Sequence, residues 1–575
     1  MKSKRIWLTV CCVLTLSLVF ASSLPAATEK PKYGGEVITV LNIADRGFDE
    51  AFVVPWQAYG VQPTHEELVT GDWTKGPAGT GEADWRTAGT GDLYWHISTG
   101  LLAEKWEFRD PQTVIFYLRK GIKFHNKPPV NGRELTAEDV KFTLERLRDS
   151  KTAYIGKNYI RGWLDRVEVP DKYTVILHGL PVDKQKVKTA LAMTGIGDIM
   201  SIVPREALEA YGGNMKDWRA VIGTGPFMLE EYVPQSSITY VRNPDYWRDD
   251  PQRPGNRLPY IDRMKILIIQ DSSTRLAAVR TSKVDFIDDV RWEDAATLKK
   301  TAPNLKSDRS LYRVVYNLYG RTDTKPFDDI RVRRALQMSL DHQMLAKKYY
   351  GGEAEILTFP VAPLPAYMGA YTPLDKLPPS SRDLYTYNPE KAKKLLAEAG
   401  YPKGFKTSIV CPSGPEYVDI LSLVKAYWEK IGVDLELQPK EYGVWHSIVT
   451  AGKHTQMAFR YKGLLLPHKL LTFLPWSTQN LARVNDQKVL DAVDQMWSFE
   501  NIQNWDKRDE ILREINKYII DKAWVISLPT PYIYSFWTPW IKNYKGELSV
   551  GCYEGYGWPQ YVWVDQDLKK KMTGK

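Results

Sequence analysis

Cysteine is scarce in this sequence, with four residues in a chain of 575. Cys11 and Cys12 fall within the first apolar run, which leaves Cys411 and Cys552 for the rest of the chain. Two cysteines are too few for a disulfide scaffold, so we expect burial of apolar side chains to stabilise the fold. The sequence leaves open whether these two cysteines pair.

Several signatures of catalysis and of nucleic-acid binding are missing as well. The eight histidines show neither an HExxH motif nor another paired metal-ligand spacing, and no GxSxG elbow is present. Long blocks of Lys and Arg, which are typical of nucleic-acid binders, are also absent. We therefore expect no metal, no cofactor and no nucleic-acid partner, and we expect that the protein is not an enzyme. The paired carboxylates of a glycoside hydrolase stay open, because the chain has 69 acidic residues.

Long apolar runs are confined to the start of the chain. Lys2, Lys4 and Arg5 precede an apolar stretch over residues 6–20, and small residues follow it. This order is typical of a secretory signal peptide, and the run is shorter than the roughly 20 residues of a membrane-spanning helix. We predict a signal peptide over residues 1–27 and a secreted protein at the periplasmic or extracellular face of the membrane. Loss of its three cations lowers the formal charge from +9 to +6.

Aromatic residues, in contrast, are abundant, with 20 Trp and 33 Tyr. Most of these rings are expected to pack in cores and hairpins, and some to form flat walls for a ligand. The content of 43% hydrophobic and 26% charged residues is ordinary for a soluble globular protein. A chain of this length is expected to form two or three domains.

The most informative stretch is Val221–Trp247, which predicts a hairpin. Gly223 and Gly225 precede Pro226, so the backbone must bend there before the alternating strand FMLEEYV. Pro234-Gln-Ser-Ser predicts the turn, and a second strand follows over residues 238–241. Strands and helices also alternate elsewhere in the chain, which indicates an α/β protein. The other predicted strands cover 37–41, 113–118, 260–270, 283–287 and 311–319, and the predicted helices start at 136, 272, 326, 388 and 444.

The sequence motifs of these segments resemble those of the extracytoplasmic solute-binding proteins of family five, the peptide and nickel binders of ABC importers. Members of that family carry a GTGPF turn followed by an RNPDYW tail, and both stand here in order within residues 221–247. The sequence also has the LAEKW and LRKGIKFH runs between Leu102 and His125. Further blocks are DSSTRLAAV at 271–279, PFDDIRVRRA at 326–335 and YNPEKAKKLLAEAG at 387–400. The resemblance extends from about Tyr33 to Tyr442 and becomes weaker afterwards.

The resemblance implies a two-lobed periplasmic-binding-protein fold of the large, three-subdomain type, with a ligand cleft between the lobes. Lobe I is divided into parts, because the chain crosses between the lobes more than once. The expected division is a signal peptide at 1–27, lobe I at 28–62, an accessory subdomain at 63–190, lobe I again at 191–310, lobe II at 311–540, and a return to lobe I at 541–575.

The resemblance also suggests where a ligand would bind. In peptide-binding relatives an acidic residue in a GWxxD run pairs with the ligand's α-amino group, but the matching stretch here, residues 456–467, contains no acid. A buried ammonium without a carboxylate is costly, which weakens the peptide assignment more than the fold. The predicted ligand-binding residues are Asn317, Tyr442, Trp445 and Arg460. Packing for Trp445, a structural turn for Asn317 and a surface ion pair for Arg460 remain alternatives.

The implied function is that of the substrate-binding component of an ABC importer. It would capture a solute outside the cytoplasmic membrane and deliver it to the permease by cleft closure, acting as a monomer. An oligopeptide is the first choice of solute, and an oligosaccharide is a close second because the aromatic excess suits stacking on sugar rings. A secreted carbohydrate-active enzyme ranks below both, and a secreted folding or sensory protein on the same scaffold would differ only in its partner surface.

A glycine-rich insertion at 76–92 contains a short repeat, AGTGEADW followed by AGTGDLYW. Phosphate-binding loops need a preceding strand and a following helix with Lys-Ser/Thr, and both are missing here. Acidic and threonine oxygens would be able to hold a cation. We instead predict an ordered loop with packed tryptophans.

Overall fold

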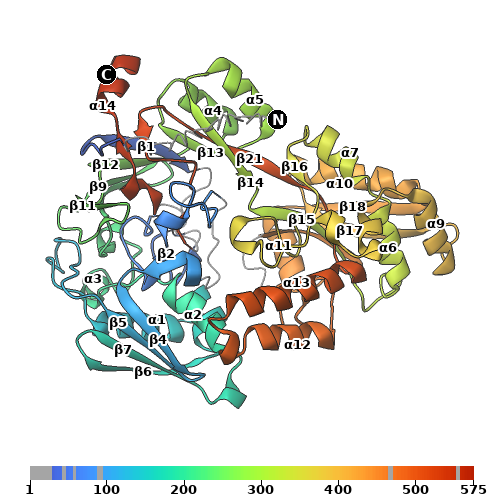
Figure 1. Ribbon diagram of the computed structural model, residues 1–575, viewed down its shortest axis with the longest axis horizontal. Coiled ribbons are helices and arrows are strands. Elements are labelled where there is room, and N and C mark those ends of the chain that lie inside the picture. The colour runs from blue at the N-terminus through green and yellow to red at the C-terminus, as the bar shows by residue number, and fades with distance from the viewer. Residues whose placement is uncertain are drawn as a thin grey trace, which may run out of the picture.

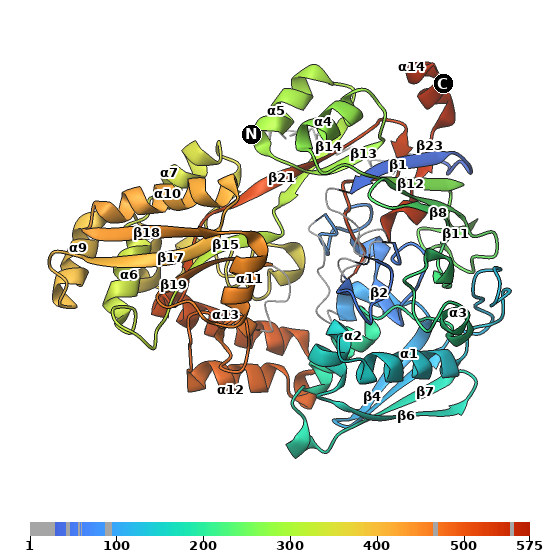
Figure 2. The same ribbon diagram turned by 180° about the vertical axis from the view of Figure 1, so that it is seen from behind.

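The computed structural model of the protein describes residues 29–41, 47–55, 58, 60–86, 95–463, 470–551 and 557–574. It has two lobes of strands and helices, which are joined by a small connecting sheet (Figures 1 and 2). The predicted two-lobed α/β fold is confirmed. The predicted signal peptide and Cys552 lie outside the described residues, whereas Cys411 is a buried free thiol on β17 of lobe II.

Lobe I is built around a four-stranded sheet in the order β1-β12-β9-β8. The predicted hairpin is confirmed, because β8 pairs with β9 in antiparallel register. β12 is shorter than the predicted strand 260–270, because it begins only at Arg263, after the fully buried Tyr260 and Ile261. The four strands are β1 (Glu36–Leu41), β12 (Arg263–Ile268), β9 (Ser237–Arg242) and β8 (Phe227–Val233).

A second antiparallel sheet of lobe I has the order β4-β5-β7-β6 and packs against helix α1 (Ala137–Asp149). Thr136 caps this helix in a capping box with Asp139, as the sequence predicts. Helix α2 (Thr189–Gly197) follows the sheet and is buried along almost its whole length. The strands are β4 (Ala103–Asp110), β5 (Thr113–Leu118), β7 (Thr174–Gly179) and β6 (Leu164–Asp171).

The GTGPF turn meets the KFH motif in the interior of lobe I. The backbone N–H of His125 donates to the Gly223 carbonyl at 2.8 Å, and the Gly223 N–H donates to Nδ1 of His125 at 3.3 Å. Nε2 of the same ring lies 3.1 Å from the Gly225 carbonyl, which also accepts from Asn243 Nδ2 at 3.0 Å. A Cβ on Gly223 would stand 2.1 Å from the Thr64 carbonyl oxygen. These motif residues therefore hold three distant segments of lobe I together, and we call them the motif node.

The connecting sheet has the order β13-β21-β14, with β16 on the other part of β21. The predicted strand 283–287 is wrong in position, since β13 begins at Phe286. Asp285 instead accepts hydrogen bonds from the Ile38 N–H at 2.8 Å and from Trp540 Nε1 at 2.7 Å. The elements are β13 (Phe286–Val290), β21 (Thr530–Trp537), β14 (Lys306–Leu311), β16 (Ala354–Glu355), α4 (Ser272–Arg280) and α5 (Trp292–Thr301).

Lobe II contains a five-stranded sheet in the order β18-β17-β19-β15-β20. The predicted strand 311–319 is two strands, because the chain leaves the connecting sheet after Leu311 and enters the sheet of lobe II at Val314. The predicted helix after Pro326 starts later, at Ile330, since the Asp329 side chain caps it. The strands are β18 (Val433–Lys440), β17 (Phe405–Pro412), β19 (Met457–Gly463), β15 (Val314–Gly320) and β20 (Ile526–Ser527).

Helices cover both faces of this sheet, and a helical pair, α12 and α13, closes the lower side of lobe II (Figure 1). Asn388 caps α9, as predicted, by accepting from the Lys391 N–H. The larger helices are α6 (Ile330–Met338), α9 (Pro389–Glu398), α10 (Pro415–Glu429), α11 (Tyr442–Thr450), α12 (Gln487–Met496) and α13 (Trp505–Lys522).

Short elements complete the described chain, and none of its helices is long and apolar enough to cross a membrane. The domain boundaries expected from the resemblance stay a prediction. The short elements are β2 (Val69–Gly71), β3 (Ser98–Gly100), β10 (Asp249–Asp250), β11 (Arg253–Arg257), β22 (Ile541–Lys542), β23 (Trp563–Val564), α3 (Arg205–Ala210), α7 (His342–Met344), α8 (Pro379–Arg382) and α14 (Gln566–Thr573).

Candidate functional site

Three parallel strands of lobe II, β18, β17 and β19, end on the side of that lobe that faces lobe I (Figure 2). Ligand sites of α/β sheets form beyond the carboxyl ends of such strands. Each of these ends carries a tyrosine. Tyr417 lies in the first turn of α10 after β17, Tyr442 begins α11 after β18, and Tyr461 lies near the end of β19.

These tyrosines and Tyr316 of β15 form a continuous group, which we call the tyrosine row. The rings of Tyr316 and Tyr417 meet edge to face at 5.8 Å, and those of Tyr417 and Tyr461 stack at 6.0 Å. The Tyr461 hydroxyl donates to the Tyr442 hydroxyl at 2.9 Å. Tyr442 is 48% exposed and the other three are half-buried, so the row offers polar hydroxyls and apolar ring surface to the space between the lobes.

The predicted ligand residue Trp445 lies behind this row. It is 1% exposed, its Nε1 donates to the Phe459 carbonyl at 3.1 Å, and its ring stacks on that of Tyr461 at 5.6 Å. Tyr442, by contrast, is exposed and stacks on His446 at 6.0 Å. The structure thus brings these two predicted residues together in α11, with Tyr442 on the surface and Trp445 in the core.

The predicted residues Asn317 and Arg460 are direct partners across β15 and β19. Asn317 is fully buried, where its Nδ2 donates to the Tyr319 hydroxyl at 3.1 Å and its Oδ1 accepts from Ser527 Oγ at 2.8 Å. Arg460 is half-buried and donates from Nη1 to the Thr478 carbonyl at 3.4 Å. A role in ligand contact stays a prediction for all four residues.

Acidic residues lie at the connecting sheet instead of after Phe459. β13 ends in a bulge, where the pairing with β21 shifts between Ile287 and Val290 and Asp289 has a positive φ of 54°. Asp289 Oδ2 accepts from Arg313 Nη2 at 3.2 Å, which ties β13 to the segment that crosses into lobe II. Asp288 stands beside it, half-buried. Sequence reasoning missed this pair, and the doubled acid in the strand FIDDV was the available signal.

Electrostatics link this acidic pair to the tyrosine row. Burial, followed by the charge of Asp289, raises the pKa of Asp288. The pKa of Tyr312, in the crossing segment, is raised to about 12 by burial and then by Asp289 and other nearby charges, among them Asp288. Tyr312 in turn contributes to the raised pKa values of Tyr417 and Tyr461.

On the side of lobe I, the glycine-rich insertion is anchored to the connecting sheet. Arg86 donates to Asp84 at 2.7 Å and to Asp308 of β14 at 2.9 Å. Trp85 is fully buried and donates to the Asp72 carbonyl at 3.1 Å. The prediction of an ordered loop with packed tryptophans is confirmed for the first copy of the repeat, whereas most of the second copy lies outside the described residues.

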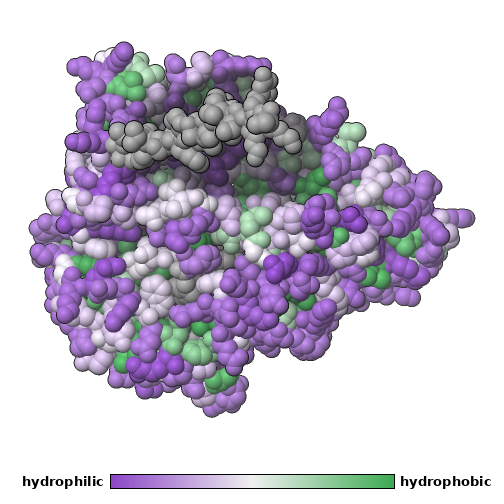
Figure 3. All heavy atoms as spheres, in the orientation of Figure 1, coloured by the Kyte–Doolittle hydropathy of each residue, from purple (hydrophilic) through white to green (hydrophobic). Residues whose placement is uncertain are grey.

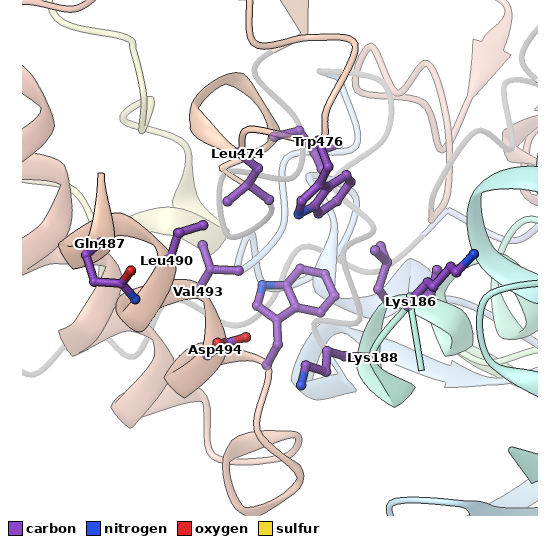
Figure 4. A pocket seen from close by; sticks show the side chains of 12 residues that line it. Lys186, Lys188, Leu474, Trp476, Gln487, Leu490, Val493 and Asp494 are labelled. Atoms are coloured by element: carbon purple, nitrogen blue, oxygen red, sulfur yellow. The ribbon is translucent and has the colours of Figure 1, made fainter. Parts of the chain in front are cut away.

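A hollow bridges the two lobes near α2 and α12 (Figure 4). It has a volume of about 270 Å³ and is lined from lobe I by residues 186–188 and Leu191. Trp476 and Trp497 line it from lobe II, and Trp476 is 66% exposed. The space-filling view shows mostly hydrophilic residues on this face, with smaller hydrophobic areas among them (Figure 3). Within the described part of the chain, no group of three or more His, Cys, Asp or Glu residues could hold a metal ion.

Comparisons with known proteins agree with this architecture. Residues 98–468 match the family described as bacterial extracellular solute-binding proteins, family 5 middle. The chain is 32% identical over 383 residues to heme-binding protein A of Haemophilus influenzae, covering 63% of this chain and 65% of that protein. It is 29% identical over 385 residues to the dipeptide-binding protein of Escherichia coli, covering 63% of this chain and 67% of that protein. The chain thus spans slightly less than two thirds of the Haemophilus protein.

A solved structure shows the same fold over nearly the whole chain. The periplasmic binding protein DppA from Helicobacter pylori, in complex with the peptide STSA, superposes with a TM-score of 0.69 at 23% identity. The superposition covers 93% of this chain and 99% of that protein. The family binds solutes, so the prediction of a receptor rather than an enzyme is confirmed. The chain belongs to family 5 of the bacterial extracellular solute-binding proteins.

Proposed function

We propose that this protein captures an oligopeptide between its lobes, outside the cytoplasmic membrane, and delivers it to the permease of an ABC importer. The observation that carries the proposal is the tyrosine row at the carboxyl ends of β17, β18 and β19, on a chain of this family. Relatives named for dipeptides, and a relative solved with the peptide STSA, support a peptide as the solute. The tyrosine hydroxyls supply hydrogen-bonding groups for a peptide backbone, and their rings supply apolar walls for its side chains.

Closure of the lobes would enclose the peptide. The chain crosses to lobe II between β14 and β15 and returns between β20 and β21. These two crossings are linked, because the Tyr312 N–H donates to the Pro531 carbonyl at 2.8 Å. A pair of linked crossing segments is suited to a hinge, since a few residues absorb the change in backbone angles. Small-angle scattering is expected to show a smaller radius of gyration with bound peptide, and an unchanged profile would contradict closure.

Within this proposal, the four predicted residues divide by exposure. Tyr442 and Arg460 would contact the peptide, because Tyr442 is exposed and Arg460 half-buried. Asn317 and Trp445 would position them, since both are buried and bonded to their own lobe. The protein would act as a monomer.

A thermal-shift screen tests the proposal. Short peptides, oligosaccharides and haem would each be added to the purified protein, because a ligand stabilises by RT ln(1 + [L]/Kd) whatever its chemistry. A peptide at 100 times its Kd is expected to add about 2.7 kcal/mol to the free energy of unfolding. Stabilisation by oligosaccharides alone would favour the second candidate, which rests on the many tyrosine rings. Stabilisation by haem alone would reject both a peptide and an oligosaccharide as the solute. Chemical conversion of an added solute would reject the receptor itself.

A further inference from the structure

Two opposite charges face the hollow that bridges the lobes, one from each lobe. Lys188 precedes α2 in lobe I, Asp494 lies in α12 of lobe II, and both line the hollow (Figure 4). Both residues are exposed, and neither side chain forms a hydrogen bond or an ion pair within the part of the chain that the structure describes. Their charged atoms are therefore further apart than the about 4 Å of an ion pair.

Each of these charges is unfavourable at its place in its own helix. Lys188 is the N-cap of α2, whose first turn has no acidic residue and whose cap forms no side-chain hydrogen bond. Asp494 lies in the last turn of α12, which has no basic residue. A helix carries partial positive charge at its N-terminus and partial negative charge at its C-terminus, so both side chains stand at the helix end of like sign. Neither helix compensates its own charge, and the opposite lobe presents the complementary one.

The position of the hollow suits a contact that forms when the lobes close. α2 and α12 lie on the lower side of the molecule, and the crossing strands β14 and β21 lie above them in both views (Figures 1 and 2). A rotation about the crossings moves the parts of the lobes that are farthest from them the most. The backbone holds the cation in place, because the N–H groups of Lys186 and Val187 donate to the Gly162 carbonyl at 2.9 and 3.1 Å. Closure would therefore bring a positioned cation towards α12.

The hollow contains a second lysine, Lys186, and α12 carries a second acid, Asp491. Figure 4 shows the Lys188 side chain on the side of the hollow where Asp494 lies, whereas Lys186 points away from that acid. Asp491 already accepts a hydrogen bond from Gln487 Nε2 at 2.8 Å. These contacts select Lys188 and Asp494 as the two partners.

We infer that Lys188 and Asp494 form an ion pair across the hollow when a solute closes the lobes, and that this interlobe pair raises the affinity for the solute without touching it. The inference rests on the proposed function, since the pair requires closure around a captured solute. The pair would stabilise only the closed state, so it would shift the equilibrium towards that state and lower the apparent Kd. Both residues are therefore positioning residues, and their effect does not depend on the chemistry of the solute.

Charge exchange tests this inference by calorimetric titration with trialanine. Lys188→Asp and Asp494→Lys are each expected to weaken binding by about threefold or more, because an ion pair is lost and like charges then face each other. The double variant restores the pair with its charges exchanged, and it is expected to bind within about twofold of the wild type.

The stability of the ligand-free variants gives an independent readout. Each single variant is expected to melt at a higher temperature than the wild type, because an unfavourable charge at a helix end is replaced by a favourable one. A higher melting temperature together with weaker binding also shows that the single variants fold. A lower melting temperature in both single variants would attribute the weaker binding to a damaged fold and overturn the inference.

Controls separate the inference from the proposed function. Asp491→Lys makes the same change of charge in α12 and is expected to bind trialanine as the wild type does. A double variant that binds no better than the weaker single variant would overturn the inference and leave peptide capture intact, as would single variants that bind as the wild type does. Rescue of Lys186→Asp by Asp494→Lys, without rescue of Lys188→Asp, would also overturn it. Failure of trialanine and of every other peptide to bind the wild type would overturn the proposed function together with the inference.

Discussion

The motif node of lobe I and the tyrosine row of lobe II use conspicuous residues in opposite ways. In the node, His125 and the two glycines of the GTGPF turn are buried and bonded to one another. In the row, the rings are half-buried or exposed, and Tyr442 is 48% exposed. The motifs that reveal the family are therefore structural, and the surface available to a solute carries no motif. This difference explains why a sequence match identifies the family more readily than the solute.

The motif node is expected to lose stability when a side chain is added at one of its close backbone contacts. Gly223→Ala would place a Cβ 2.1 Å from the Thr64 carbonyl oxygen, so the backbone of two segments must move. We expect a loss of about 3 kcal/mol or more in the free energy of unfolding, measured by urea denaturation. Gly463→Ala is the matched control, because its Cβ would come no closer than 3.9 Å to a neighbour, and it is expected to change stability little. Equal stability of the two variants would refute the close packing of the node.

A lower pH is expected to destabilise the motif node through protonation of His125 in the unfolded chain. Burial lowers the pKa of this histidine to about 3, so it stays neutral in the folded protein while the unfolded chain takes up a proton near pH 6.5. Its contribution to stability is fully present above pH 6.5 and is lost as the pH falls towards 3, by about 1.4 kcal/mol per pH unit. Urea denaturation between pH 7 and pH 4.5 measures the slope. His125→Gln is expected to start less stable and to show a smaller slope, and an unchanged slope would place the titration elsewhere.

Substitution in the tyrosine row is expected to weaken peptide affinity and to leave the stability of the fold unchanged. Tyr442→Ala removes an exposed ring and the acceptor of the Tyr461 hydroxyl. We expect peptide binding to weaken by about two- to tenfold, since a lost aromatic contact is worth about 0.5–1.5 kcal/mol. The urea midpoint should remain near that of the wild type. A lower midpoint together with normal affinity would reverse the distinction between row and node.

The smallest effect is expected at the hollow that bridges the lobes. Trp476→Ala removes a 66% exposed ring that lines it. Because closure of the lobes would bring this ring against lobe I, we expect the free energy of peptide binding to weaken by about 1 kcal/mol or less, with stability unchanged. Scattering with saturating peptide should still show closure. Normal affinity would exclude this hollow from the closing contact.

The local elements were largely predictable from the sequence. The hairpin of β8 and β9, the capping box of α1 and the Asn388 cap of α9 each depend on neighbouring residues, so periodicity and capping signals suffice. Predicted strand positions were wrong where contacts between distant chain segments determine the structure. The predicted strand 311–319 breaks at Tyr312 and Arg313, because the chain changes sheets there.

The sequence by itself determined the family, the α/β class and the absence of an acid in β19. Only the tertiary structure decided which tyrosines form the tyrosine row. Tyr316 is distant from Tyr417 and Tyr461 in the sequence, and the pairing of β15 with β19 and the start of α10 bring the three rings together. The physical reason is that a binding site between lobes depends on long-range contacts and on burial, and neither is written in local sequence patterns.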